Sequence, residues 1–384
     1  MINYSNINYW DGFSNGLSEG DIFVSGEHFE EPGEQEKIEV RDMSGLFAIP
    51  GLIDAHVHMC LNPDVKDPHR QTDPDDEQIK QEIRDRAAAM LRAGITTARD
   101  LGGGEYLELE IRDEINTAQT IGPRLICAGQ PITSVAGHCH FWGGEAASTI
   151  DALKVLHRQH EHSVDLIKVM VTGGNITPGS QPRDSQFSDD TIASIVSTAA
   201  GLDYHVAAHC HGTDGIRQAA IAGVRTVEHC SWVGDAGWGK AFDEQVVAAL
   251  ADNNVWVSPT INFGWRRFTG KEFTERVLGN YEKMKLAGVK LIASTDAGIP
   301  NVYHHDLPKA LPVFGRIAGL SSIEVLRSAT SDCARAIGLG DTTGRITTGY
   351  SADFVVYEEN PLLDLSVLEK PILVVSRGRA LEIR

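Results

Sequence analysis

Two histidines end an apolar stretch near the start of the chain, and their spacing suits a metal ion. The stretch runs from Phe47 to His58 and also contains His56. If it forms a strand, side chains two residues apart point the same way, so both imidazoles could hold one divalent ion. Two ordinary half-buried histidines would fit the pair equally well. The other metal-competent residues therefore have to decide between the two interpretations.

Further metal-competent residues lie in or at the ends of later apolar runs, namely Lys168, His209, His229 and Asp296. As an ammonium, Lys168 has the wrong charge for a ligand. A lysine on an apolar strand can, however, lose its proton and take up carbon dioxide, which gives an anionic carbamate. On the residue alone, an ammonium paired with a buried carboxylate is the simpler interpretation. Glu228, which precedes His229, should point to the opposite side of its strand and make a structural contact.

The elements that must position these residues are eight short apolar runs separated by helical stretches such as 78–91 and 190–200. The runs are 51–58, 95–100, 124–130, 166–171, 204–209, 225–229, 255–260 and 291–296. Continuous apolar runs with amphipathic connectors are typical of parallel strands covered by helices. We predict an α/β fold with a (β/α)8 TIM barrel over 49–346, in which the strand ends bring the ligands together on one face.

The two ends of the chain carry short β-like pieces, including 21–24, 37–40, 352–357 and 372–375. Neither end has enough of them to form a core alone. We therefore predict that residues 1–48 and 347–384 form one small β-sandwich domain beside the barrel.

The composition of the chain limits the kinds of partner that it can bind. The 384 residues have a formal net charge of −19, which argues against nucleic acid and anionic membranes, since both require a basic surface. No apolar run has the length of a membrane span, and the first residues lack the features of a signal peptide, so we expect a cytoplasmic protein. The six cysteines show no paired spacing and are expected to be free thiols. Whether the chain forms a homo-oligomer stays open.

Several motifs resemble those of one family. They are HVH at 56–58, GITTARDLGG at 94–103, KVMVTGG at 168–174, EHC at 228–230 and STDAG at 294–298. On these motifs the chain is identified as a member of the amidohydrolase superfamily. Within it, the chain is most similar to the prolidase-like (Xaa-Pro dipeptidase) and imidazolonepropionase-like branch.

The resemblance implies a binuclear centre of two divalent ions of the zinc type. The implied ligands are His56, His58 and Asp296 for one ion, His209 and His229 for the other, and a carbamylated Lys168 as the bridge. Two ions that share a water lower its pKa toward about 7, so a metal-bridging hydroxide is the expected nucleophile. Asp296 is the predicted catalytic residue, which takes up the proton and passes it to the leaving amine.

Substrate contacts are expected from loops. His138 and His140 form a second histidine pair in a glycine-rich loop, and we favour His140, then His138, as substrate-binding residues over a solvated pair. In the prolidase-like relatives, a histidine of a similar loop binds the carboxylate of the substrate. Arg183 is a further candidate for a free carboxylate. His211 and Arg267 lie in loops expected on the same face, where either could bind an anion, and we favour solvated surface residues for both.

We predict a binuclear metal-dependent amidohydrolase that cleaves the amide bond of a dipeptide or N-acyl amino acid. The alternative is a hydrolase of a neutral amide, carbamate or aryl-urea. It is favoured by the lack of a tyrosine at 259–265 and by the aromatic Phe263, Trp265 and Trp232. A mononuclear deaminase would need no lysine bridge, and a non-catalytic scaffold would be expected to lack ligands that are all present here.

Overall fold

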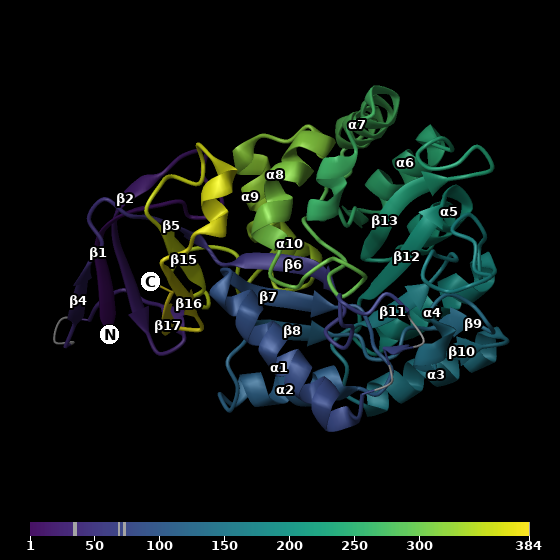
Figure 1. The fold of residues 1–384 in the computed structure, drawn as a ribbon, viewed down its shortest axis with the longest axis horizontal. Coiled ribbons are helices and arrows are strands. Elements are labelled where there is room, and N and C mark those ends of the chain that lie inside the picture. Colours follow the sequence, from purple (N-terminus) through teal and green to yellow (C-terminus); the bar gives the residue numbers. More distant parts are fainter. Residues whose placement is uncertain (34–36, 68–69, 72–73, 384) are drawn as a thin grey trace.

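The computed structural model describes residues 1–33, 37–67, 70–71 and 74–383. Strands from both ends of the chain lie together on one side of the molecule, and helices surround parallel strands on the other side (Figure 1). The prediction of a mixed α/β protein with parallel strands is confirmed.

The terminal strands pair as one sheet in the order β17-β16-β15-β5-β1-β2-β3, with β4 beside β1. They are β1 (Ile2–Tyr9), β2 (Ser18–Ser25), β3 (His28–Phe29), β4 (Glu39–Asp42), β5 (Phe47–Pro50), β15 (Phe354–Tyr357), β16 (Leu373–Ser376) and β17 (Arg379–Glu382). The sheet has its own buried cluster, in which the rings of Tyr4 and Phe354 lie 5.1 Å apart. The two ends of the chain therefore depend on each other for burial.

The remaining strands are parallel and form two ladders and a short pair. One ladder contains β6 (Leu52–Val57), β7 (Ile95–Asp100) and β8 (Arg124–Cys127). The other contains β11 (Ile167–Met170), β12 (Val206–Gly212), β13 (Thr226–Val233) and β14 (Trp256–Ser258), and the pair is β9 (Thr133–Ser134) with β10 (Glu145–Ala146). Nearly every residue of the two ladders is buried, which explains their continuous apolar sequences.

The eighth predicted strand, 291–296, is not a strand and makes only an isolated bridge at its start. Its backbone N–H groups bond to groups outside a regular ladder. The N–H of Ala293 donates to the Ser328 carbonyl at 2.9 Å, and that of Thr295 donates to the Asp54 carboxylate at 3.1 Å. The segment still lies beside β6, because Ala297 bridges Val57 in parallel.

Helices follow the parallel strands. They are α1 (Asp76–Arg92), α2 (Leu107–Asn116), α3 (Thr149–Glu161), α4 (Asp189–Gly201), α5 (Thr213–Ala222), α6 (Glu244–Asp252), α7 (Lys271–Leu286), α8 (Leu307–Ala318), α9 (Ser322–Ser328) and α10 (Ser331–Ala336), with 3-10 turns η2 (His140–Trp142), η3 (Phe263–Arg267) and η4 (Leu365–Glu369). The predicted helical stretches 78–91 and 190–200 lie in α1 and α4. Asp75 and Ser188 cap these two helices by accepting backbone N–H bonds.

Within the described part of the chain, no helix combines the length and the apolar character that crossing a membrane requires.

Candidate metal centre

The first group of metal-competent side chains lies at the end of β6. The Nε2 atoms of His56 and His58 are 3.3 Å apart, and Asp296 Oδ1 lies 3.2 Å from the first and 3.4 Å from the second. The two imidazoles point the same way because they are two residues apart on an extended chain. One nitrogen or oxygen from each of the three residues lies within 4.8 Å of the others, the spacing of a three-ligand site.

Hydrogen bonds on the far side of each ring fix which nitrogen is free. His56 Nδ1 lies 3.0 Å from Glu228 Oε2, and His58 Nδ1 lies 2.8 Å from the carbonyl oxygen of Gly102. Both acceptors require a proton on Nδ1, so in the neutral ring Nε2 is the nitrogen with a lone pair, and it faces Asp296. A carboxylate or carbonyl behind a histidine is the usual arrangement at metal sites.

The prediction that Glu228 points away from the site is wrong. Its side chain is completely buried and joins His56 to Arg99, whose Nη2 lies 2.8 Å from Glu228 Oε1. Burial alone would raise the pKa of Glu228, but Arg99 and His56 hold this pKa well below its usual range. Alternation fails here because His229 has a left-handed backbone with φ of 67°, which breaks the extended chain directly after Glu228.

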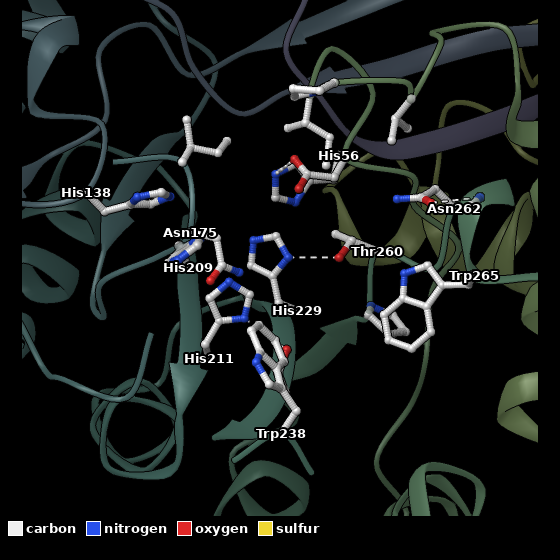
Figure 2. Close-up of a pocket in the computed structure, with 18 of the residues that line it drawn as sticks. His56, His138, Asn175, His209, His211, His229, Trp238, Thr260, Asn262 and Trp265 are labelled. Atoms are coloured by element: carbon white, nitrogen blue, oxygen red, sulfur yellow. Dashed lines mark hydrogen bonds and ion pairs between the residues drawn. The ribbon is translucent and has the colours of Figure 1, made fainter. Parts of the chain in front are cut away.

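The second group comes from β12 and β13 and contains His209, His211 and His229, again with one ring nitrogen each within 4.8 Å of the others. Figure 2 shows the labelled rings turned toward one another. His229 Nδ1 bonds to Thr260 Oγ1 at 2.8 Å, and His211 Nδ1 to Ser231 Oγ at 2.9 Å. Burial and the neighbouring positive groups hold the pKa values of His209 and His229 well below their ordinary value, so both rings are neutral.

Interpreting His211 as a solvated loop residue is wrong, because it is buried within β12. The predicted run stopped at His209, whereas the strand continues to Gly212. Positions 209 and 211 are two apart on this strand, as in the first histidine pair. That spacing in HCH at 209–211 was the available signal.

Lys168 lies in β11 and is 1% exposed. Burial lowers the pKa of its amine, although the charges of Glu228 and Asp296 oppose this. Among the described residues, no hydrogen bond or ion pair to its Nζ atom is within the usual distance. A buried amine with a lowered pKa and no fixed partner is the form that can react with carbon dioxide.

Three residues of the centre adopt left-handed backbone without being glycine. They are His229, Thr260 and Asp296, with φ of 67°, 52° and 62°. For Thr260, a β-branched residue, this conformation is especially unfavourable. Such residues persist only where their surroundings hold them, and they concentrate at functional sites. The Thr260 N–H donates to Ser294 Oγ at 3.0 Å, which is part of that support.

Both groups open into a cavity of about 810 Å³. Asp296 is 15% exposed toward it, and burial alone would raise the pKa of this carboxyl, but His56 and His58 hold the pKa well below its usual range. Asp296 is therefore ionised at neutral pH. Its Oδ1 atom lies within 3.4 Å of both ring nitrogens, so the carboxylate can act as a ligand and as a proton acceptor.

Of the predicted substrate-binding residues, only His138 lines the cavity. Its ring lies 4.6 Å from that of His209, its Nδ1 is buried without a hydrogen-bond partner among the described residues, and burial lowers its pKa to about 4. His140 faces Glu145 outside the cavity, and Arg183 is 51% exposed and paired with Asp235. The placement therefore favours His138 and supports neither His140 nor Arg183.

The donor set fits two divalent ions. Neutral imidazoles and carboxylate oxygens are ligands that zinc-like ions take, and the hydrogen bonds behind His56, His58 and His229 orient their rings. Each group supplies three donors and faces the same cavity, with Lys168 among the residues that line it.

Comparisons with known proteins identify relatives of the chain. The family model described as "Amidohydrolase family" matches the sequence over residues 47–381. The chain is 25% identical to ochratoxinase from Aspergillus niger over 84% of this chain and 72% of that one, and 25% identical to probable imidazolonepropionase from Homo sapiens over 90% and 82%. A crystal structure of a Xaa-Pro dipeptidase with bound methionine superposes with a TM-score of 0.86 at 23% identity, over 99% of both chains.

Proposed function

The chain belongs to the amidohydrolase family and is a hydrolase of C–N bonds, and from this premise we propose that it is a binuclear enzyme that cleaves the amide bond of a dipeptide or N-acyl amino acid. The observation that carries the proposal is the pair of three-ligand groups on one cavity, with a buried lysine beside them. A single ion would need only one such group.

His56, His58 and Asp296 would hold one ion, His209 and His229 the other, and a carbamate on Lys168 would bridge them. His211, which the structure adds to the second group, is available as a further donor or as a contact to substrate. Bound ions of the zinc type would act as Lewis acids, which would lower the pKa of a water toward about 7 and polarise the carbonyl of the substrate.

The residues of the chain move the proton and orient the substrate. Asp296 is ionised, so it can accept the proton of the attacking water and return it to the nitrogen of the leaving amine. Glu228 holds the proton of His56 on Nδ1 and keeps that ring in place. His138 lines the cavity, where its ring can contact the substrate.

We also propose that the parallel strands close into a (β/α)8 barrel and that the terminal strands form a separate β domain. Three parallel bridges, Ile132–Val169, Val257–Leu291 and Val57–Ala297, support closure because they connect the two ladders into one circuit. The pairing of β5 with β1 and β15 supports a boundary at about residue 51, near the predicted residue 48.

The second candidate is a hydrolase of neutral aryl amides or aryl-ureas. It is favoured by the aromatic side chains on the cavity wall, which include Trp142, Trp238 and Trp265. A substrate without charge would use these surfaces alone. The two candidates differ in whether a free carboxylate is required.

The experiment is hydrolysis by zinc-reconstituted protein of a library that contains dipeptides, N-acyl amino acids, neutral anilides and aryl-ureas. We expect release of free amino acids and a metal content of about two equivalents. Turnover of the neutral compounds alone would support the second candidate. Absence of any turnover at full metal content would reject both.

One variant tests the assigned proton acceptor. Asp296→Asn cannot take up the proton, so kcat should fall by about 10²- to 10⁴-fold while far-UV circular dichroism stays unchanged. Asp235→Asn is the matched control, since this residue is 94% exposed and does not line the cavity. Near-normal activity of Asp296→Asn would contradict its role.

A further inference from the structure

The charges on the cavity wall are unlike those of the rest of the chain. Apart from Lys168 and Asp296 at the metal groups, the charged side chains that line the cavity within the described residues are Lys240, Arg267 and Arg276. All three are cations, although the whole chain has 53 acidic and 34 basic residues. A positive wall in an acidic protein indicates a site for an anion.

The three cations come from α7 and two segments that pack on it. Phe268, next to Arg267, contacts Phe273 of α7 with ring centroids 5.3 Å apart. Arg276 belongs to α7, Lys240 follows the loop after β13, and Arg267 ends η3. Asn280 of α7 donates to the carbonyl oxygen of Gly239 at 3.0 Å, and a Cβ at Gly239 would lie 3.5 Å from Arg276 Nε. The loop that carries Lys240 therefore rests against α7 beside Arg276.

Little in the protein neutralises this group. Arg276 Nη1 lies 3.3 Å from Glu272, but its Nε is buried without a hydrogen-bond partner among the described residues. For Lys240 and Arg267, no ion pair with another described residue is within 4 Å. Lys240 and Arg267 are exposed residues of the cavity lining, so their charges are free to bind a ligand.

Aromatic side chains on the same wall lie near these cations. Trp265, Phe268 and Phe273 form a cluster with ring centroids 5.3–6.3 Å apart, and all three line the cavity. Trp238 lies edge-on to His211 at 4.9 Å, and Figure 2 shows it next to the histidines. The wall therefore offers apolar aromatic surface beside the metal groups and positive charge on the same segments.

The geometry points to a substrate with a free carboxylate that Lys240 and Arg267 bind, assisted by Arg276, and with a large apolar side chain that packs on Trp238, Trp265 and Phe268. Such a molecule is an N-acyl amino acid or dipeptide whose carboxyl-terminal residue is aromatic or bulky and aliphatic. The assignment of the reacting amide rests on the proposed function. It also replaces His140 and Arg183, which lie outside the cavity lining, as the carboxylate anchor.

Binding of two unreactive compounds tests the assignment without turnover. N-tosyl-L-phenylalanine and its carboxamide carry a sulfonamide in place of the amide and differ in the carboxylate charge. With metal-loaded protein, calorimetry should show that the carboxylate binds at least about tenfold more tightly, and added salt should reduce the difference. The double variant Lys240→Gln/Arg267→Gln, which keeps Arg276, should lose most of this difference in affinity. Arg266→Gln is the control, because Arg266 adjoins Arg267 but does not line the cavity.

The results distinguish failure of the anion site from failure of the proposed hydrolase function. Equal affinity for the two compounds in the unmodified protein, or undiminished discrimination in the double variant, would overturn the anion site. Discrimination that depends on Lys240 and Arg267, together with no hydrolysis of any amide in the library, would keep the anion site and reject the proposed function. For substrates that are hydrolysed, the double variant should raise KM for carboxylates and leave kcat nearly unchanged.

Discussion

Lys168 connects metal content with the chemistry proposed for the centre. Removing its amine removes the group that would carry the bridging carbamate in the proposed site, while a methionine fills the same buried space. We expect Lys168→Met to hold about one equivalent of zinc or less, measured by mass spectrometry after reconstitution, with loss of turnover. Lys154→Met, on the exposed side of α3, should retain two equivalents. Two equivalents in Lys168→Met would show that the bridge is not needed.

Glu108 predicts a pH dependence of stability. Both of its carboxyl oxygens are buried without a hydrogen-bond partner among the described residues, and burial, with the nearby Asp100, raises its pKa to about 8. The folded chain therefore keeps a proton that the unfolded chain releases. The contribution of the protonated Glu108 carboxyl to the free energy of unfolding is complete below its ordinary pKa of 4.5. This contribution is lost as the pH rises through about 8.

Glu108→Gln should remove this dependence, because glutamine matches the neutral carboxyl in shape. Between about pH 6 and pH 8 the free energy of unfolding of the unmodified protein should fall by up to about 1.4 kcal/mol per pH unit more steeply than that of the variant. Chemical denaturation at several pH values measures this. Glu105→Gln, at an exposed position, should leave the slope unchanged, and an unchanged slope in Glu108→Gln would contradict the assignment.

The direction of a functional side chain could be predicted from the sequence where the backbone is regular. His56 and His58 follow strand alternation, so their shared direction could be read from spacing. His138 and His140 have the same spacing, but Cys139 between them has a left-handed backbone, and η2 begins at His140. Only His138 therefore faces the cavity, and no local pattern in the sequence indicates that turn.

At the scale of elements, two glycines provide opposite tests of backbone packing. A Cβ at Gly51, between β5 and β6, would lie 2.0 Å from Thr96 Oγ1, whereas a Cβ at Gly279 in α7 meets nothing within 4 Å. Gly51→Ala should cost about 1–3 kcal/mol of unfolding free energy through overpacking. Gly279→Ala should gain about 0.5–1 kcal/mol, because alanine is the better helix former. Denaturant unfolding compares them, and equal effects would refute the argument.

Strands with continuous apolar sequence and helices with clear caps could be found from the sequence. The runs that became β6, β7 and β11 needed only local pattern, and so did α1 and α4. The segment 291–296 has the same apolar composition but lacks a regular ladder, because Ser328 and Asp54 take its N–H groups. Those partners are distant in the sequence, so composition could not predict the difference.

At the scale of the whole molecule, one ion pair with a buried carboxylate joins the terminal sheet to the parallel strands. Arg124 Nη1 in β8 lies 3.1 Å from Asp353 Oδ2, and this carboxylate is fully buried. Arg124→Met would leave the charge of Asp353 without its ion-pair partner, so the free energy of unfolding should fall by about 3 kcal/mol. Adding Asp353→Asn should recover part of the loss, and a double-mutant cycle by chemical denaturation measures the coupling. Additive effects would mean that the pair does not join the two parts energetically.

The left-handed backbone at positions 229, 260 and 296 limits which sequences the fold can accept. Histidine, aspartate and asparagine adopt this conformation more readily than most residues, so two of these positions already carry types that suit both the backbone and a metal. Random mutagenesis there should return few folded clones even when selection asks only for solubility. A search for new activities would therefore gain more from varying Trp238 and Phe268, which line the cavity on right-handed or extended backbone.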